Sequence, residues 1–233
     1  MKNWAMLFQE RFDMRYLYEN LIADGAYRFF LMGLGFTLYI VAVGLIIGTF
    51  CGIILCAMSL SRFKILQLIS RGYTLFMSGT PVILILMLFF YVILAPFGID
   101  AALSAIIAFG LRSGALIGEI MKSALAGVEQ GQINAARTLG FNRWGAFFNV
   151  TLPQAVKIGK PLYKHNAVNL IQDTSVVGYI TVNDLTRVVN SMGSRTGNPL
   201  MALLVGIAIY LLLSGIVSSI FNITDGRLLK RKS

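Results

Sequence analysis

The stretch FFLMGLGFTLYIVAVGLIIGTFCGIILCAMSLS, residues 29–61, contains no charged side chain. Two further stretches, 72–99 and 196–224, are also free of charge. Each is longer than the roughly 20 apolar residues with which a helix crosses the hydrocarbon core of a bilayer. The whole chain has 233 residues and is only 13% charged, against roughly 25% in an ordinary soluble domain. These patterns predict an all-α integral membrane protein.

The number of spans depends on one polar segment. Four spans are indicated by hydropathy, the last of them interrupted by Arg112 and Glu119: 29–58, 72–95, 198–222 and 101–121. The segment 162–182 is too polar for hydropathy alone to decide. If it did not cross, the basic middle loop and the basic C-terminal tail would lie on opposite sides, which the positive-inside rule disfavours.

We therefore predict five transmembrane helices in the bacterial cytoplasmic (inner) membrane, with the N-terminus outside and the C-terminus inside. This topology places thirteen of the twenty basic residues in the cytoplasm: Arg62, Lys64, Arg71, Lys122, Arg137, Arg143, Lys157, Lys160, Lys164, Arg227, Lys230, Arg231 and Lys232. The net charge of +10 is explained by this orientation, so a nucleic-acid partner is not predicted. Cys51 and Cys56 lie inside the first apolar run and are interpreted as packing residues.

Three regions follow along the chain. Residues 1–28 are predicted to form an extracytoplasmic amphipathic segment, because Trp4, Phe8 and Phe12 recur on one helical face; a partly ordered tail is the alternative. Residues 29–225 form the transmembrane domain. Residues 226–233 form a basic cytoplasmic tail.

The fourth predicted span carries polar side chains at membrane depth, where each is costly unless it faces protein or water. Asn166, Asn169 and Asp173 are three and four residues apart and so share one helical face. This pattern is typical of a helix that lines a transport path. A hydrogen-bonded seam between two helices would explain the same pattern.

Two further features lie in the predicted spans 72–95 and 101–121. Pro81, in SGTPVIL (78–84), is expected to open its helix around Met77 because it lacks an N–H and clashes with the carbonyl four residues earlier. Arg112 and Glu119 are two turns apart on one face, about 10 Å, which is too far for a direct bond.

The stretch 122–160 is predicted to be a cytoplasmic loop with its own structure, because simple connections are shorter. Two short helices are expected in it, near 129–139 and 142–150. Gly140 is a natural stop for the first and Asn142 a cap for the second. Pro153 is expected to mark an elbow.

This loop resembles the EAA motif of ABC-importer permeases. The motif has Glu-Ala-Ala, then Gly four residues later, and Ile-x-Leu-Pro after nine more; this chain has Asn134-Ala135-Ala136, Gly140 and Val150-Thr151-Leu152-Pro153. Further blocks are similar to the polar amino-acid uptake family, of the histidine/glutamine permease kind. These are SGTP (78–81), GEIMKSALAGVEQGQ (118–132), LPQA (152–155), Asn166 and QDTSV (172–176).

The resemblance implies a type I importer subunit that moves a polar amino acid by alternating access. Its implied partners are a cytoplasmic ATPase dimer that uses ATP and Mg, a second permease subunit (identical or a paralogue) and an extracytoplasmic amino-acid-binding protein. The residues implied to couple the ATPase are Glu129, Gly131, Asn134, Ala135, Ala136, Gly140, Leu152 and Pro153. The residues assigned to the substrate pathway are Gly79, Thr80, Pro81, Glu119, Asn166, Asn169, Gln172, Asp173, Thr174 and Ser175.

Three positions depart from the family pattern, since Asn134 replaces Glu, Ser78 replaces Arg and Gln172 replaces Lys. A secondary transporter or channel is the main alternative, but the paired repeats typical of such proteins are not seen. A structural scaffold would not need polar residues at membrane depth. An enzyme is disfavoured, because the single histidine, His165, has no triad or metal partners beside it in the sequence, and no cofactor or metal is predicted in this chain.

Overall fold

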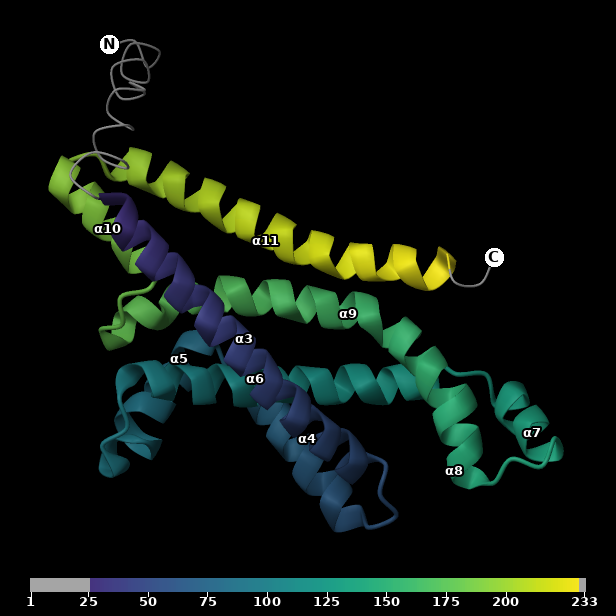
Figure 1. Ribbon diagram of the computed structural model, residues 1–233. Helices are drawn as coiled ribbons and strands as arrows, with labels where there is room; N and C mark the ends of the chain where they lie inside the picture. The colour runs from purple at the N-terminus through teal and green to yellow at the C-terminus, as the bar shows by residue number, and fades with distance from the viewer. Residues whose placement is uncertain (1–25, 231–233) are drawn as a thin grey trace, which may run out of the picture.

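The computed structural model describes residues 26–230, and every regular element in this range is a helix. Four long helices form the framework (Figure 1): α3 (Ala26–Ser59), α6 (Ala101–Ala126), α9 (Leu152–Asp173) and α11 (Pro199–Lys230). The shorter elements are α4 (Lys64–Gly79), α5 (Val82–Leu88), η2 (Phe89–Ile93), η3 (Ala95–Phe97), α7 (Gln130–Thr138), α8 (Arg143–Ala146), η4 (Phe147–Thr151), η5 (Thr174–Ile180) and α10 (Leu185–Thr196). The predicted all-helical class is confirmed for these residues.

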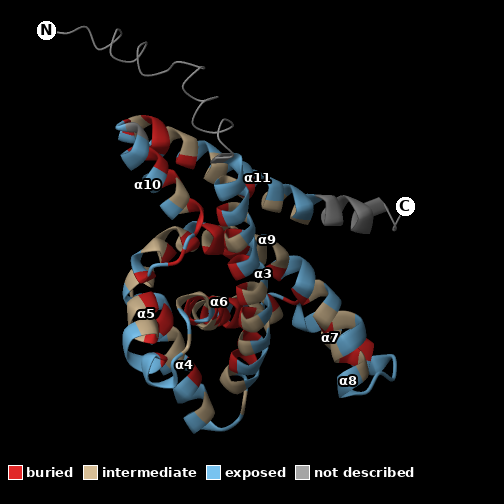
Figure 2. Ribbon diagram, turned by 60° about the vertical axis from the view of Figure 1, so that its left-hand side comes forward, coloured by how far each residue is buried: buried red, intermediate tan, exposed pale blue. Residues whose placement is uncertain are grey.

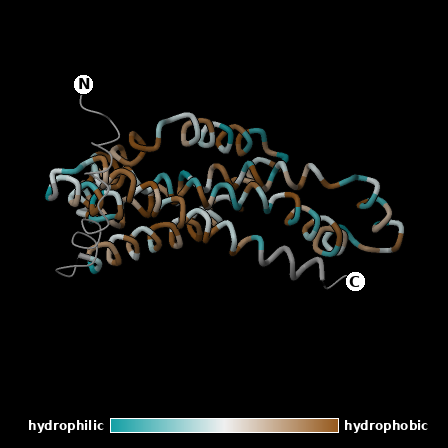
Figure 3. The backbone as a smooth tube through the Cα atoms, turned by 90° about the horizontal axis from the view of Figure 1, so that it is seen from above, coloured by the Kyte–Doolittle hydropathy of each residue, from teal (hydrophilic) through white to brown (hydrophobic). Residues whose placement is uncertain are grey.

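Three helices, α3, α6 and α11, are long and apolar enough to cross a membrane. The pair Lys64–Gly79 (α4) and Val82–Ile93 (α5 with η2) would supply a fourth span if counted together, although the chain bends by 111° between the two helices. Hydrophobic residues predominate along the long helices (Figure 3). A membrane protein is therefore supported, while the fifth span and the orientation remain predictions. In chain order the second candidate span begins at Lys64, earlier than the predicted 72. Because the first half of α4 is amphipathic, hydropathy underestimates the length of this span.

The centre of the fold is α6, which is buried on most of its surface and is seen end-on in Figure 2. Phe109 and Ile117 are completely buried. Apolar side chains of α3, α4, α5, η2 and α9 pack against it, and one continuous core joins them to η5, α10 and α11. Burying such side chains contributes about 1.5–3 kcal/mol each in a soluble core, but within a bilayer close packing contributes instead.

The closest packing in the chain is between α3 and α6, at glycines spaced four residues apart. Gly44, Gly48 and Gly52 of α3 face Gly110, Gly114 and Gly118 of α6. A Cβ atom added at Gly52 would lie 2.7 Å from Cγ2 of Ile117, and one at Gly114 would lie 2.7 Å from Cβ of Cys51. Small residues at this spacing let membrane helices approach closely. These six glycines form the α3–α6 glycine ladder. Cys51 packs against Gly114 of this ladder, as its interpretation as a packing residue predicts.

The predicted elbow at Pro153 is not a break in the helix. The backbone stays helical from Arg143 through η4 into α9, and the π-helical turn η4, in which Leu152 N donates to the carbonyl of Phe147, lies directly before the proline. The chain changes direction between α8 and α9 (Figure 1), and prolines and π-helical turns are common causes of such bends. Because α9 begins at Leu152, ten residues before the predicted 162, the irregular part of the predicted loop 122–160 is also shorter than expected.

The connecting helices lie at opposite ends of the long ones. In Figures 1 and 3, α7 and α8 extend beyond one end, and α10 lies at the other end beside the start of α3. The predicted amphipathic segment, with Trp4, Phe8 and Phe12, lies outside the described residues. Of the predicted tail 226–233, residues up to Lys230 continue the backbone of α11, and the last three lie outside the described part.

Candidate functional site

A polar seam joins α6 to the end of α9. Arg112 Nη1 lies 2.7 Å from Asp173 Oδ2, and each side chain is only about a fifth exposed. Arg112 Nε is buried and makes no hydrogen bond. Arg112 and Glu119 were predicted to be too far apart for a direct bond, and each has a different partner, since Glu119 lies 3.9 Å from Lys122. The seam thus pairs two charges that the sequence separates by 61 positions.

The same seam contains Asn166, whose Nδ2 donates to Ser113 Oγ at 2.8 Å. Asn166 is 4% exposed, so the alternative of a hydrogen-bonded helix contact explains this residue. Among the neighbouring pathway residues, Asn169 and Ser175 are half-buried and Gln172 is exposed. Thr174 is buried and donates to the carbonyl of Ile171.

The Gly79–Pro81 stretch separates α4 from α5. The prediction that the helix opens around Met77 is wrong. Helix α4 continues to Gly79, and Pro81 is the N-cap residue of α5. In this position the proline has no helical carbonyl behind it to clash with, and its own carbonyl accepts from Ile85 N. Gly79 and Pro81 are exposed and Thr80 is half-buried.

The predicted pathway residues do not gather around one cavity. Glu119 lines a cavity between α4 and α6 with Arg71 and Lys122. Asn166 and Asp173 point instead into the α6–α9 contact. Gly79 to Pro81 lie at the break, where α5 packs against α6 and η5. The assignment of a pathway therefore remains a prediction.

The second candidate site is the segment from α7 to α8. Glu129 is the N-cap residue of α7, and its carboxylate accepts from the side-chain Nε2 of Gln132 at 3.4 Å. The helix ends at Thr138 with Leu139 as its C-cap, and Gly140 follows with φ at +90°. Asn142 Oδ1 accepts from Gly145 N at 2.6 Å and caps α8. The predicted stop and the predicted cap are both confirmed, although regular α-helix after the cap extends only to Ala146 before η4.

Ala136, one of the residues assigned to ATPase coupling, does not lie on the exposed face of α7. Ala135 and Gly140 are exposed, but Ala136 is 5% exposed and lies against the chain itself. Its small size lets α7 pack on the segment that follows. Asn134 is exposed, and its side chain accepts from Gln130. Gly131 is also exposed.

Sequence reasoning missed the apolar side chains around Gly140. Leu139 is 80% exposed, Trp144 69% and Phe148 57%. The Trp144 and Phe148 rings stack at 6.1 Å between centroids. An apolar residue beside the helix-stopping glycine, followed by Asn-Arg-Trp, was visible in the sequence as a signal for an exposed contact surface.

The segment is fixed to the helix bundle at its base. Gln154 of α9 donates to Gln132 of α7 at 2.6 Å. Ala124, Val128 and Ala155 form a small buried cluster below it. Leu152 is half-buried, and Pro153 is exposed at the side of a groove with Gln132, Asn149 and Lys157. These contacts connect the base of α7 to α9 and to the end of α6.

Within 26–230 no three His, Cys, Asp or Glu side chains gather as metal ligands would. His165 is exposed on α9.

Comparison with known proteins agrees with this arrangement. Residues 44–230 match the family described as binding-protein-dependent transport system inner membrane component. The arginine transport system permease protein ArtQ of Bacillus subtilis is 32% identical over 202 residues, which cover 86% of this chain and 92% of the relative. A crystal structure of an amino acid ABC transporter with histidines superposes with a TM-score of 0.78 at 28% identity, covering 86% of this chain and 94% of that one.

An inward-facing methionine ABC transporter shares the fold, with a TM-score of 0.67 at 16% identity and coverage of 86% and 98%. The family match covers most of the chain, including the polar seam and the α7–α8 segment. The chain therefore belongs to the binding-protein-dependent transport system inner membrane component family, the permeases of ABC transporters.

Proposed function

We propose that this chain is the membrane subunit of an ATP-driven importer that carries a polar amino acid across the bacterial cytoplasmic membrane. The observation that carries the proposal is the α7–α8 segment. It extends beyond one end of the long helices (Figure 1) and presents exposed Leu139, Gly140 and Trp144. The relatives whose names state a cargo, such as the arginine permease ArtQ, support an amino acid as the substrate.

In this proposal α7 is the coupling helix. A separate ATPase dimer binds the open face around Leu139 and Gly140, and ATP-driven closure pulls the two coupling helices of the complex together. The contacts of α7 with α6 and α9 carry that movement into the bundle. The Arg112–Asp173 seam lies on this route, because it joins the same two helices.

The topology proposed is five spans with the N-terminus outside. The doubtful span is the predicted 162–182, in which residues 162–173 of α9 (about 18 Å at 1.5 Å per residue) are followed by the seven residues of η5 (about 14 Å at 2.0 Å per residue), together enough for the hydrocarbon core. A second permease subunit, identical or paralogous, completes the pore. An extracytoplasmic binding protein delivers the amino acid to the end of the bundle at which α10 lies.

Reconstitution tests the function. The chain, its ATPase and its binding protein are placed in liposomes, and ATP-dependent uptake is measured for each amino acid. We expect uptake of a polar amino acid that needs all three components. Uptake that continues without the ATPase and follows an ion gradient instead would identify a secondary transporter.

Cysteine labelling tests the topology. In a background with Cys51→Ala and Cys56→Ala, a thiol is introduced by Asn190→Cys in α10 or by Thr138→Cys in α7; both positions are exposed. A membrane-impermeant maleimide should label the first from outside and the second only after the membrane is opened. Labelling of both from the same side would remove α9 as a span.

A further inference from the structure

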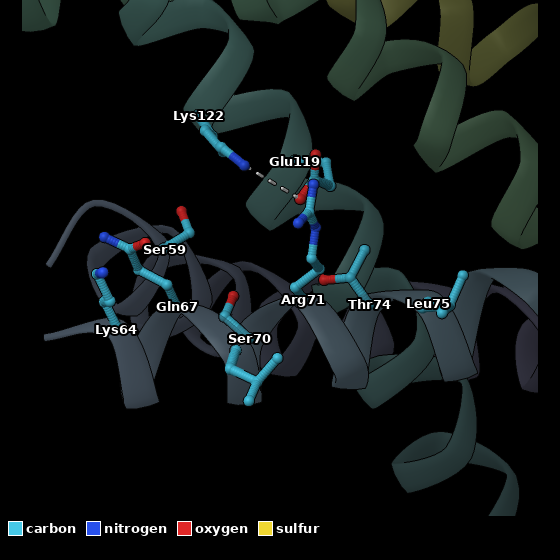
Figure 4. Close-up of a pocket in the computed structure, with 10 residues that line it drawn as sticks. Ser59, Lys64, Gln67, Ser70, Arg71, Thr74, Leu75, Glu119 and Lys122 are labelled. Carbon is cyan, nitrogen blue, oxygen red and sulfur yellow. Dashed lines mark ion pairs between the residues drawn. The ribbon is translucent and has the colours of Figure 1, made fainter.

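A cavity of about 760 Å³ lies between α4, the end of α3 and the last turns of α6. Figure 4 shows polar side chains of all three helices converging on it. Its lining residues are Ser59, Lys64, Gln67, Leu68, Ser70, Arg71, Thr74, Leu75, Glu119 and Lys122. Only Glu119 among them belongs to the predicted pathway, so the cavity is a separate feature of the chain.

The cavity carries a positive charge. Three cations, Lys64, Arg71 and Lys122, line it with a single carboxylate, that of Glu119. The one ion pair marked there joins Glu119 to Lys122 at 3.9 Å (Figure 4), a loose contact between half-exposed groups. One carboxylate cannot neutralise three cations, so the cavity attracts an anion.

The backbone adds to this attraction. The helix α4 begins at Lys64, and its N-cap residue Phe63 makes no side-chain cap. The first amides of a helix are donors without partners inside the helix, and the helix dipole makes this end positive. Lys64 is the first residue of this helix, and Arg71 follows two turns later on the same face of α4.

Apolar side chains lie among the cations on one face of α4. Lys64, Leu68, Arg71 and Leu75 follow one another at intervals of four, three and four residues, so they form a single stripe along the helix. Leu75 is 73% exposed and lies one turn beyond Arg71. A ligand with an anionic head and a hydrocarbon tail can contact the guanidinium and this leucine together.

We propose that this cavity binds the phosphate group of an anionic phospholipid from the cytoplasmic leaflet, with Arg71 at the phosphate and Leu75, one helical turn further along α4, against an acyl chain. The leaflet rests on the proposed orientation, in which the start of α4 and the end of α6 face the cytoplasm. Arg71 suits this role because a guanidinium can hold two phosphate oxygens at once.

Lipid retention tests the proposal without any transport measurement. The full chain with its ATPase is reconstituted in nanodiscs containing equal amounts of phosphatidylcholine and phosphatidylglycerol, extracted in detergent, and analysed for retained lipid by mass spectrometry. We expect enrichment of phosphatidylglycerol in the wild type. Arg71→Gln should lower it about fivefold, since one cation near an anionic lipid contributes about 1 kcal/mol.

The matched control is Arg62→Gln. Arg62 is an exposed arginine on the connection just before α4, but it does not line the cavity. It should leave the enrichment unchanged, which separates the cavity from general attraction by a basic surface. Equal losses in the two variants would overturn the proposal.

Inorganic phosphate and the free transported amino acid serve as competitors during extraction. Retention of phosphatidylglycerol in their presence supports a lipid site. If either competitor displaces the lipid as effectively in the wild type as Arg71→Gln does, the cavity binds a small anion and the lipid assignment is wrong. Since uptake is not the readout, failure here leaves the proposed transport function standing.

Discussion

Arg112 of α6 and Asp173 at the end of α9 form an ion pair, with Nη1 and Oδ2 2.7 Å apart. Both side chains lie within the helical bundle and are about four-fifths buried. Each side chain neutralises the charge of the other, and a single unpaired charge would be costly at this depth. The pair also fixes the rotation of α9 relative to α6, together with Asn166 and Ser113.

Breaking this pair from one side should be worse than removing it from both. Asp173→Asn leaves the guanidinium without its counter-charge, and Arg112→Gln leaves the carboxylate, at a cost of up to about 3 kcal/mol in the free energy of unfolding. The double variant Arg112→Gln/Asp173→Asn should recover a large part of that loss. Thermal unfolding in detergent of the four proteins measures the coupling.

Uptake by the same four proteins separates packing from transport. If the seam serves transport, the double variant should unfold like the wild type and still take up substrate more slowly. Wild-type uptake by Asp173→Asn would contradict the assignment of this residue to the substrate pathway.

The order of the long helices was largely predictable, because continuous apolar runs such as that at 29–61 are local signals, but the bounds of α4 and α9 were not. The seam was only half predictable. The spacing of Asn166, Asn169 and Asp173 showed a polar face, but nothing in the sequence showed that Arg112, 61 positions away, would pair with it. Local patterns do not encode which distant face a polar stripe contacts.

One failure has a local physical cause. Pro81 is predicted to open a helix around Met77, whereas it directly precedes the first residue of α5, where its missing amide has no effect. In contrast, the α3–α6 glycine ladder was visible as two runs of glycines four residues apart. It could have predicted the most extensive contact of the fold.

Gly140 tests the coupling segment. Its φ of +90° is unfavourable for residues with a Cβ atom, although nothing lies within 4 Å of the position such an atom would take. Gly140→Val should therefore redirect the chain between α7 and α8 at a cost of about 1–3 kcal/mol and abolish coupled ATP hydrolysis, with membrane insertion retained. Gly140→Asn is the control, because asparagine tolerates positive φ. Full coupled hydrolysis in the valine variant would remove α7 from the docking site.

The exposed side chains beside Gly140 should contribute to ATPase affinity. Truncating a central aromatic or aliphatic anchor of an interface costs about 2 kcal/mol or more. We expect Leu139→Ser and Trp144→Ala each to weaken binding of the ATPase about thirtyfold, measured with the purified permease in nanodiscs. Phe97→Ala is the matched control, since Phe97 is 75% exposed but lies in η3, outside the α7–α8 segment. An equal effect of Phe97→Ala would point to general destabilisation.

The α3–α6 contact should be the least tolerant of added volume. Gly52→Leu and Gly114→Leu each place side-chain atoms where Ile117 or Cys51 already lies, and overpacking of this kind costs about 1–3 kcal/mol. Gly35→Leu, on the same helix as Gly52, meets nothing within 4 Å of its Cβ position. The first two variants should lower the unfolding temperature in detergent and the yield of inserted protein, and the third should change neither. If all three behave alike, the helices are not held together by this close approach, and the packing of α3 must depend on the apolar side chains around Ile40 and Val41 instead.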